Sequence, residues 1–244
     1  MAAPEIRVLH LLEGARQADG LAIIIDVFRA FTLAPCAFAR GVASILPVAT
    51  AAEALAMKRT DPDLLLAGEQ DGKPLTGFDF SNSPAAILRA ELTGRRLVLR
   101  TSAGVQGLLA ATRADEVITG SFVNAAAIAA WVRHRKPARV SLVCMGWNAS
   151  ERTAEDEACA HYLAAGLRGG FPDFPPILER LRIDASGAKF FDPARPWFPE
   201  EDFAVCMQPS AWPFVLRRTR DAAGRLCLER VAAPPAAGDA VAAL

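Results

Sequence analysis

The segment Leu21–Val27 constrains the fold most, because it is an apolar, largely β-branched run that only Asp26 interrupts. A short run of this composition predicts a strand buried on both faces, as in a parallel sheet with helices on both sides. Asp26 and Arg29 lie where this strand would give way to a helix, and open α/β sheets bind ligands at that edge. A carboxylate there can hold a divalent cation, and an arginine in the first helical turn can donate to a phosphate. The alternative is that Asp26 only caps the helix and pairs with Arg29.

Strand-like runs alternate with helical patterns through the first two-thirds of the chain. The predicted strands are Ile6–Leu11, Leu21–Val27, Ser44–Val48, Leu64–Ala67, Arg96–Arg100, Glu116–Thr119 and Val140–Met145. This alternation predicts right-handed crossovers between parallel strands, and therefore an α/β fold with three α/β/α layers and a mostly parallel sheet.

Capping residues predict where several helices begin and end. Thr50–Glu53 has the spacing of a capping box, and Ser83–Pro84 places an N-cap before a proline in the first helical position. Ala125–Arg135 and Thr153–Leu167 predict two further helices, the second of which ends before Gly169.

The composition changes after Gly170, where proline-rich segments interrupt the pattern. The signals there predict a short helix and the two strands of a hairpin, at Ile177–Ile183, Phe214–Thr219 and Arg225–Val231. We expect residues 1–170 to form the main region that carries the site. Residues 171–244 would pack on the same domain as a C-terminal segment, with a loose tail from Ala232. The apolar hairpin can cover its own core or pair across a homodimer, and the sequence leaves both open.

Composition points to a small-molecule ligand. The 27 basic and 27 acidic residues cancel, so the bulk charge favours neither nucleic acid nor a membrane surface. The N-terminus lacks the pattern of a secretion signal and the apolar runs are too short to span a bilayer, so we expect a cytoplasmic protein. The five cysteines show no metal-binding spacing and are expected to be reduced, buried thiols.

Polar and small residues follow most of the predicted strands. They are Asp26 and Arg29, Gly68-Glu69, Thr101–Gly104, Gly120-Ser121 and Gly146-Trp147. In a parallel sheet these ends open on one edge, where they would converge on a single crevice. Small residues let backbone N–H groups approach an anion closely, which suits phosphate recognition.

Carboxylates near the crevice are candidate metal ligands. Glu69 and Asp79 belong to loops rich in carboxylates, glycine and amides, and such oxygen ligands suit Mg²⁺. Asp156 begins a predicted helix, where it can bind metal or act as a general acid or base. The plainer alternatives are a solvated turn for the loops and compensation of the helix dipole for Asp156.

Six segments, taken in order, resemble the signatures of the 2-phosphosulfolactate phosphatase family. They are Asp26–Thr32, Leu46–Thr50, Ala67–Glu69, Gly77–Pro84, Gly120–Ala125 and Glu155–Ala160. The resemblance implies a three-layer α/β/α fold and a Mg²⁺-dependent phosphatase that converts 2-phospho-3-sulfolactate to 3-sulfolactate and phosphate, a step toward coenzyme M. Many members carry T-T-N-G-T where this chain has Thr101–Val105, so a related small phospho-acid is also a candidate substrate.

The hypothesis is therefore a metal-assisted phosphatase acting on a small phosphorylated substrate. We expect catalysis by Asp26, Arg29 and Asp156, substrate contacts from Arg29, Ser102, Gly104, Ser121 and Asn124, and Mg²⁺ ligation by Asp26, Glu69 and Asp79. The alternative is a protein that binds phosphorylated or sulfonated metabolites in the same crevice without turning them over.

Overall fold

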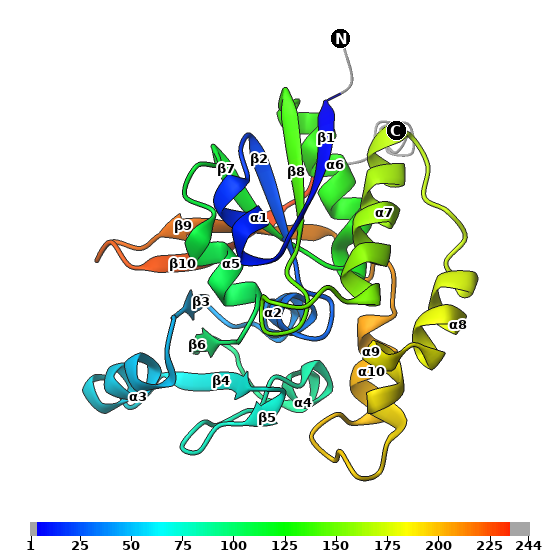
Figure 1. Ribbon diagram of the computed structural model, residues 1–244. Helices are drawn as coiled ribbons and strands as arrows, with labels where there is room; N and C mark the ends of the chain where they lie inside the picture. The colour runs from blue at the N-terminus through cyan, green and yellow to red at the C-terminus, as the bar shows by residue number, and fades with distance from the viewer. Residues whose placement is uncertain (1–3, 235–244) are drawn as a thin grey trace, which may run out of the picture.

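A ten-stranded mixed sheet runs through the computed structural model, which describes residues 4–234 (Figure 1). Its strands are β1 (Glu5–His10), β2 (Leu21–Ile25), β3 (Ser44–Pro47), β4 (Leu65–Gln70), β5 (Lys73–Pro74), β6 (Arg96–Arg100), β7 (Glu116–Gly120), β8 (Arg139–Cys144), β9 (Phe214–Arg220) and β10 (Leu226–Ala232). Their order across the sheet is β1-β8-β2-β7-β9-β10-β3-β6-β4-β5. All seven predicted strands are present within a few residues of their predicted bounds, and the predicted hairpin forms β9 and β10.

Most helices pack on the two faces of this sheet, and the last three in the chain pack mainly on other helices. The helices are α1 (Leu11–Gln17), α2 (Ala30–Ala39), α3 (Ala51–Thr60), α4 (Pro84–Arg89), α5 (Gly104–Ala110), α6 (Ala125–Arg135), α7 (Ala154–Arg168), α8 (Pro175–Ile183), α9 (Ala185–Ala188) and α10 (Glu200–Cys206), with short 3₁₀ turns η1 (Phe122–Asn124) and η2 (Lys189–Phe191). The predicted caps are confirmed: Thr50 Oγ1 accepts from Glu53 N at 3.1 Å and Ser83 Oγ from Ala86 N at 3.1 Å.

The sheet consists of two parallel groups joined by the C-terminal hairpin. Strands β1, β8, β2 and β7 are parallel, as are β3, β6 and β4. The hairpin β9–β10 lies between them, antiparallel to β7 on one side and to β3 on the other. The two groups therefore run in opposite directions, and the prediction that all strand ends share one edge of a parallel sheet is wrong. Nothing local in the sequence shows that a terminal hairpin will enter the middle of the sheet.

The strand ends nevertheless meet, because the two groups stand at a steep angle with α2 in the corner between them (Figure 1). Gly104 N, after β6 of one group, donates to Asp26 Oδ2, after β2 of the other, at 2.7 Å.

Successive side chains of β2 point to opposite faces of the sheet, so the strand contributes to the hydrophobic core on each face. Ala22 and Ile24 pack with α1, α2 and α5, whereas Leu21, Ile23 and Ile25 pack with α6 and α7. A smaller core lies under α3. This arrangement confirms the predicted three layers, because the strands β2, β6, β7 and β8 bury both of their faces.

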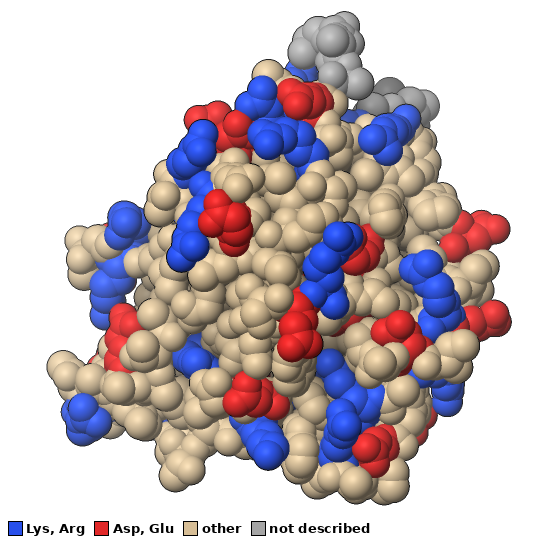
Figure 2. Space-filling view, viewed as in Figure 1, with Lys and Arg blue, Asp and Glu red and all other residues tan. Residues whose placement is uncertain are grey.

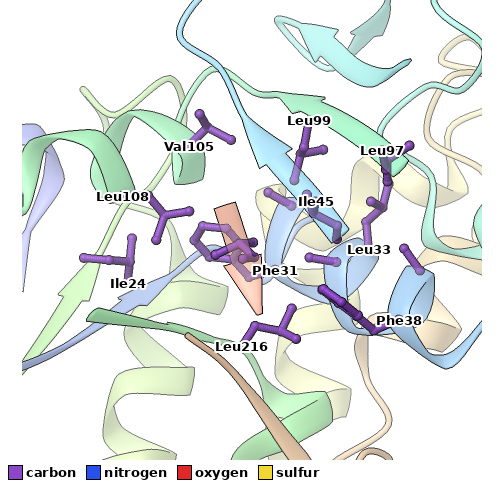
Figure 3. Packing of buried hydrophobic residues seen from close by; sticks show 14 of the residues in the cluster. Ile24, Phe31, Leu33, Phe38, Ile45, Leu97, Leu99, Val105, Leu108 and Leu216 are labelled. Atoms are coloured by element: carbon purple, nitrogen blue, oxygen red, sulfur yellow. The ribbon is translucent and has the colours of Figure 1, made fainter. Parts of the chain in front are cut away.

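Helix α2 is buried along almost its whole length, from Ala30 to Phe38. A helix that is apolar on all sides belongs inside a protein, and α2 accordingly fills the space between the two strand groups. Figure 3 shows Phe31 among Ile24 of β2, Leu108 of α5 and Leu216 of the hairpin strand β9.

The C-terminal hairpin covers its own core, since Phe214, Leu216 and Leu228 are all buried in it. The five cysteines are free and buried, as predicted. The end of the predicted tail, residues 235–244, lies outside the described residues. Among the residues described, no helix combines the length and apolar character needed to cross a membrane. On the face drawn in Figure 2, basic and acidic side chains are interspersed.

Leu216→Ala is expected to lower the free energy of unfolding by about 3 kcal/mol, because it leaves a cavity where the hairpin meets α2. Urea unfolding measures the change. The control Ile183→Ala removes a side chain that is 82% exposed and should have little effect. Equal changes in both variants would contradict the central place of the hairpin in the core.

Candidate functional site

Four of the predicted site residues line one cleft between the ends of the two strand groups. The lining residues are Asp26, Phe28, Arg29, Glu69, Gly72, Asn82, Ser102, Ala103, Gly146, Trp147, Asn148 and Phe198. The cleft encloses about 20 Å³, room for an ion or a water molecule. The four predicted residues in this lining are Asp26, Arg29, Glu69 and Ser102, which lie up to 76 residues apart in sequence.

Asp26 is held at the end of β2 by backbone donors. Its Oδ1 accepts from Ala30 N at 3.1 Å and its Oδ2 from Gly104 N at 2.7 Å. The side chain is buried, and this burial raises its pKa from 3.8 to about 7, while the two N–H donors oppose the rise and the charge of Glu69 adds to it. A carboxylate in this position gains by binding a cation.

Glu69 faces Asp26 from the end of β4 and is also buried. Its Oε1 accepts from Ser102 N at 2.6 Å, and its Oε2 from Gly72 N at 2.7 Å. Ser102 Oγ lies 3.3 Å from the same Oε2. Each carboxylate oxygen has two lone pairs, so these contacts leave acceptor capacity for a metal ion.

Asn82 adds a third oxygen to the cleft. It is 4% exposed, and its Oδ1 is buried without a hydrogen-bond partner among the described residues. A buried, unpartnered carbonyl oxygen beside two carboxylates is the donor set that suits a hard divalent cation. The residues of the cleft therefore fit Mg²⁺. Asn82 belongs to the Gly77–Pro84 segment, but the sequence analysis did not assign it to the site.

Arg29 lines the cleft with its fork of donors largely engaged. Nη1 donates to Asp202 Oδ2 at 2.8 Å and to Trp197 O at 2.8 Å, and Nη2 donates to Gly72 O at 3.1 Å. The guanidinium also lies 4.7 Å from the centre of the Phe198 ring. These contacts use three of its five N–H groups.

Asp202 completes this buried ion pair, in which the two side chains are 1% and 0% exposed. Its Oδ1 accepts from Ser83 Oγ at 2.6 Å and from Ala85 N at 3.0 Å. The sequence analysis missed Asp202, because an acidic residue in the first turn of a helix is common and carries no separate signal.

Asp156 lies behind the cleft wall, in the first turn of α7. Its Oδ1 accepts from Val27 N at 2.9 Å and its Oδ2 from Gly146 N at 2.8 Å, which ties α7 to the loops after β2 and β8. Burial raises its pKa well above the ordinary value, and the charges of Glu155 and Asp26 add to the rise. Its geometry is that of a brace for the two loops.

Gly104 serves Asp26 directly. A Cβ added there would lie 2.6 Å from Asp26 Oδ2, so only glycine lets its N–H approach this closely. In this structure the N–H is used by Asp26, whereas the sequence analysis expected it to contact phosphate.

Three further predicted residues lie outside the cleft, in addition to Asp156 and Gly104. Asp79 pairs with Lys58 Nζ at 2.5 Å and accepts from Leu66 N at 2.7 Å. Ser121 Oγ donates to Phe31 O at 2.9 Å, and Asn124 Oδ1 accepts from Ser121 N at 3.3 Å. The structure therefore does not bring Asp79, Ser121 or Asn124 together with Asp26.

A second group of possible ligand atoms lies apart from the cleft. Ligand atoms of His10, Cys144 and Glu157 lie within 4.8 Å of one another. Glu157 Oε1 already contacts His10 Nδ1 at 2.9 Å and Arg152 Nε at 2.9 Å. With two basic partners on this carboxylate, the group is explained as an ion-pair cluster.

Comparison with known proteins places the chain among the phosphoric monoester hydrolases. It belongs to the family described as 2-phosphosulpholactate phosphatase, which matches residues 8–187. A relative from Bacillus subtilis (strain 168) is 35% identical over 201 residues, covering 82% of this chain and 87% of the relative. One from Caldicellulosiruptor saccharolyticus is 34% identical, covering 64% and 65%, and one from Deinococcus radiodurans is 38% identical, covering 57% and 58%. All three carry the name probable 2-phosphosulfolactate phosphatase.

Asp202→Ala is expected to lower the free energy of unfolding by about 3–5 kcal/mol, because it leaves the Arg29 charge buried without its partner. Chemical unfolding monitored by circular dichroism measures the loss. Glu229→Ala breaks the exposed pair with Arg217 and should cost about 1 kcal/mol or less. A loss of similar size in both variants would show that the buried pair does not carry this stability.

The raised pKa of Asp26 predicts how stability depends on pH without metal. In the folded protein the Asp26 carboxyl stays protonated up to about pH 7, whereas in the unfolded chain it loses its proton near pH 3.8. The free energy of unfolding should therefore fall as the pH rises between these values, and Asp26→Asn should reduce the fall. Asp156 and Glu155 shift in the same direction, so part of the fall should remain. Urea unfolding in EDTA at about pH 5 and about pH 7.5 checks this, and identical pH dependences in wild type and variant would contradict it.

Proposed function

We propose that the protein is a Mg²⁺-dependent phosphatase that hydrolyses 2-phospho-3-sulfolactate, or a related small phospho-acid, to the hydroxy acid and phosphate. The observation that carries the proposal is the cleft in which Asp26, Glu69 and the unpartnered Oδ1 of Asn82 present oxygen donors together. Family membership supports the reaction class.

Asp26, Glu69 and Asn82 would hold the metal ion. When bound, Mg²⁺ would neutralise negative charge on the phosphoryl group and favour attack by water. Asp79 has no place in this set, because its carboxylate is paired with Lys58 outside the cleft.

The chain's own residues then position the phosphate. Arg29 supplies a permanent positive charge at the cleft, and the Asp202 and Phe198 contacts keep its guanidinium in one orientation. Ser102 places a hydroxyl beside Glu69 at the same wall. Gly104 and Ala30 keep Asp26 oriented through their N–H groups, so Asp26 need not reorganise during the reaction.

The proposed substrate follows from the relatives' names and the chemistry of the cleft. The segment Thr101–Val105, which departs from the T-T-N-G-T pattern, supplies Ser102 and Gly104 to the site. The backbone N–H groups of Ser102 and Gly104 donate to Glu69 and Asp26. These two contacts do not depend on the side chains in which the segment departs from the T-T-N-G-T pattern. A phosphate ester of a small hydroxy acid therefore remains the best match.

Asp26→Asn and Glu69→Gln are each expected to lower phosphate release from 2-phosphosulfolactate by about a hundredfold or more, because each removes a charged metal ligand. EDTA should abolish release by wild type, and Mg²⁺ should restore it. Asp79→Asn should stay within about threefold of wild type, since Asp79 is outside the cleft. A colorimetric phosphate assay over a panel of small phospho-acids makes the measurement.

Metal-independent release, or full activity in both cleft variants, would contradict the proposed site. Binding of the esters without release from any of them would instead favour a binding protein, which ligand-dependent thermal stabilisation would reveal. Release from another ester alone would keep the reaction and reassign the substrate.

A further inference from the structure

A second, larger pocket adjoins the cleft. It encloses about 460 Å³, and Trp147 and Phe198 line both spaces. Its other walls come from the first turn of α7 and from the segment that contains α9 and η2. The cleft itself, at about 20 Å³, is too small for a whole phospho-acid, whereas the pocket beside it has the size of a small-molecule site.

Lys189 in this pocket is a buried cation, and the charge that acts on it most strongly is that of the nearby Glu155 carboxyl. The Lys189 side chain is 8% exposed, and among the described residues its ammonium group makes no ion pair or hydrogen bond. Aromatic rings surround it instead, with Nζ 4.8 Å from the centre of Trp147 and 5.0 Å from that of Phe198. Cation–π contacts offset only part of the cost of burying an ammonium group.

Unpartnered polar groups gather beside Lys189. Thr153 Oγ1, Ser186 Oγ and Glu155 Oε2 are buried without hydrogen-bond partners among residues 4–234. Glu155 is 4% exposed, and Lys189 exerts the strongest charge effect on it. Thr153 and Ser186 are close enough to this carboxyl to affect its pKa, although neither contact has hydrogen-bond geometry. Native proteins leave few such groups unpaired, so a cluster of them indicates a place for a polar ligand.

An anionic group with several oxygens would satisfy this set. The ammonium group and the two hydroxyls are donors, and neither hydroxyl has a hydrogen-bond partner among the described residues. Arg152 and Arg195 also line the pocket, but they are paired with Glu157 and Asp192, and the carboxylates of Glu151 and Asp184 line it too. Lys189 is therefore the cation of this lining that is free to bind an anion. Lys189 and Arg195 lie beyond residue 187, where the family match ends.

We propose that this pocket binds the second anionic group of the substrate, a sulfonate or carboxylate, and that Lys189 is the residue that selects for it. The inference rests on the proposed function, since it takes the phosphate to occupy the adjoining cleft. A substrate with one charged group at each end would span the wall formed by Trp147 and Phe198.

The test compares three hydroxy acids that differ in one group: 3-sulfolactate, malate and lactate, which carry a sulfonate, a carboxylate and a hydrogen on the third carbon. Calorimetric titration with Mg²⁺ present should show wild type binding 3-sulfolactate or malate at least about tenfold more tightly than lactate. The better of the two identifies the preferred anion. Lys189→Met should reduce the preference to about twofold, whereas Lys189→Arg should retain most of it.

Lys73→Met is the matched control. Lys73 also lies over an aromatic ring, 5.0 Å from the centre of Trp197, but it is exposed and lines neither space. It should leave the preference unchanged. If Lys189→Met does not fold, Ser186→Ala provides the second test, with an expected loss of preference of about threefold or more.

Equal binding of all three acids by wild type would overturn the proposal. An unchanged preference in Lys189→Met would also overturn it. If Lys189→Met does not fold, an unchanged preference in Ser186→Ala has the same meaning. Asp26→Asn separates this proposal from the proposed function. It should abolish phosphate release and keep the Lys189-dependent preference. If Asp26→Asn still released phosphate while the preference depended on Lys189, the catalytic assignment would fail and the anion pocket would stand.

Discussion

The buried ion pair between Arg29 and Asp202 holds the site together. It joins the loop after β2 to α10, and Asp202 also binds the start of α4 through Ser83 and Ala85. The same guanidinium also donates to the carbonyl oxygens of Gly72 and Trp197. One arginine therefore links the loop after β2 to the β4–β5 turn and to the segment that leads into α10. A buried pair of this kind adds little net stability compared with an apolar contact, but breaking it is costly. Its role here is to hold the positively charged guanidinium of Arg29 in place at the cleft.

The cleft keeps two carboxylates close together at a cost in stability. Asp26 and Glu69 are both buried, and backbone N–H groups bind every one of their oxygens. These donors orient the carboxylates without neutralising them, which leaves the charge available to a metal ion. Burial, with a smaller contribution from the charge of Glu69, raises the pKa of Asp26 to about 7, which reflects the cost of holding this carboxylate in the cleft without a cation.

The sequence predicted local structure well, because strands and caps depend on neighbouring residues. The run at β2, the Thr50 and Ser83 caps and the β9–β10 hairpin were all found where expected. Asp26, Glu69, Arg29 and Ser102 also meet in one cleft as expected, although they meet where two opposed strand groups join and not along one parallel edge. Asp79, Ser121 and Asn124 do not, because they contact Lys58, Phe31 and Ser121 instead, and the sequence pattern does not reveal these contacts. Asn82 and Asp202 were missed, since their importance comes from contacts with distant segments.

The sequence by itself determined the fold class, the family and the residues at the strand ends, because these follow from local hydrophobic periodicity and ordered motifs. Only the tertiary structure decided that the terminal hairpin enters the centre of the sheet, so that the two parallel groups of strands run in opposite directions. It also decided which carboxylates face the cleft and that Lys189 lies in the adjoining pocket. The physical reason is that strand pairing and charge burial depend on groups far apart in the chain, and no local pattern specifies which of them will meet.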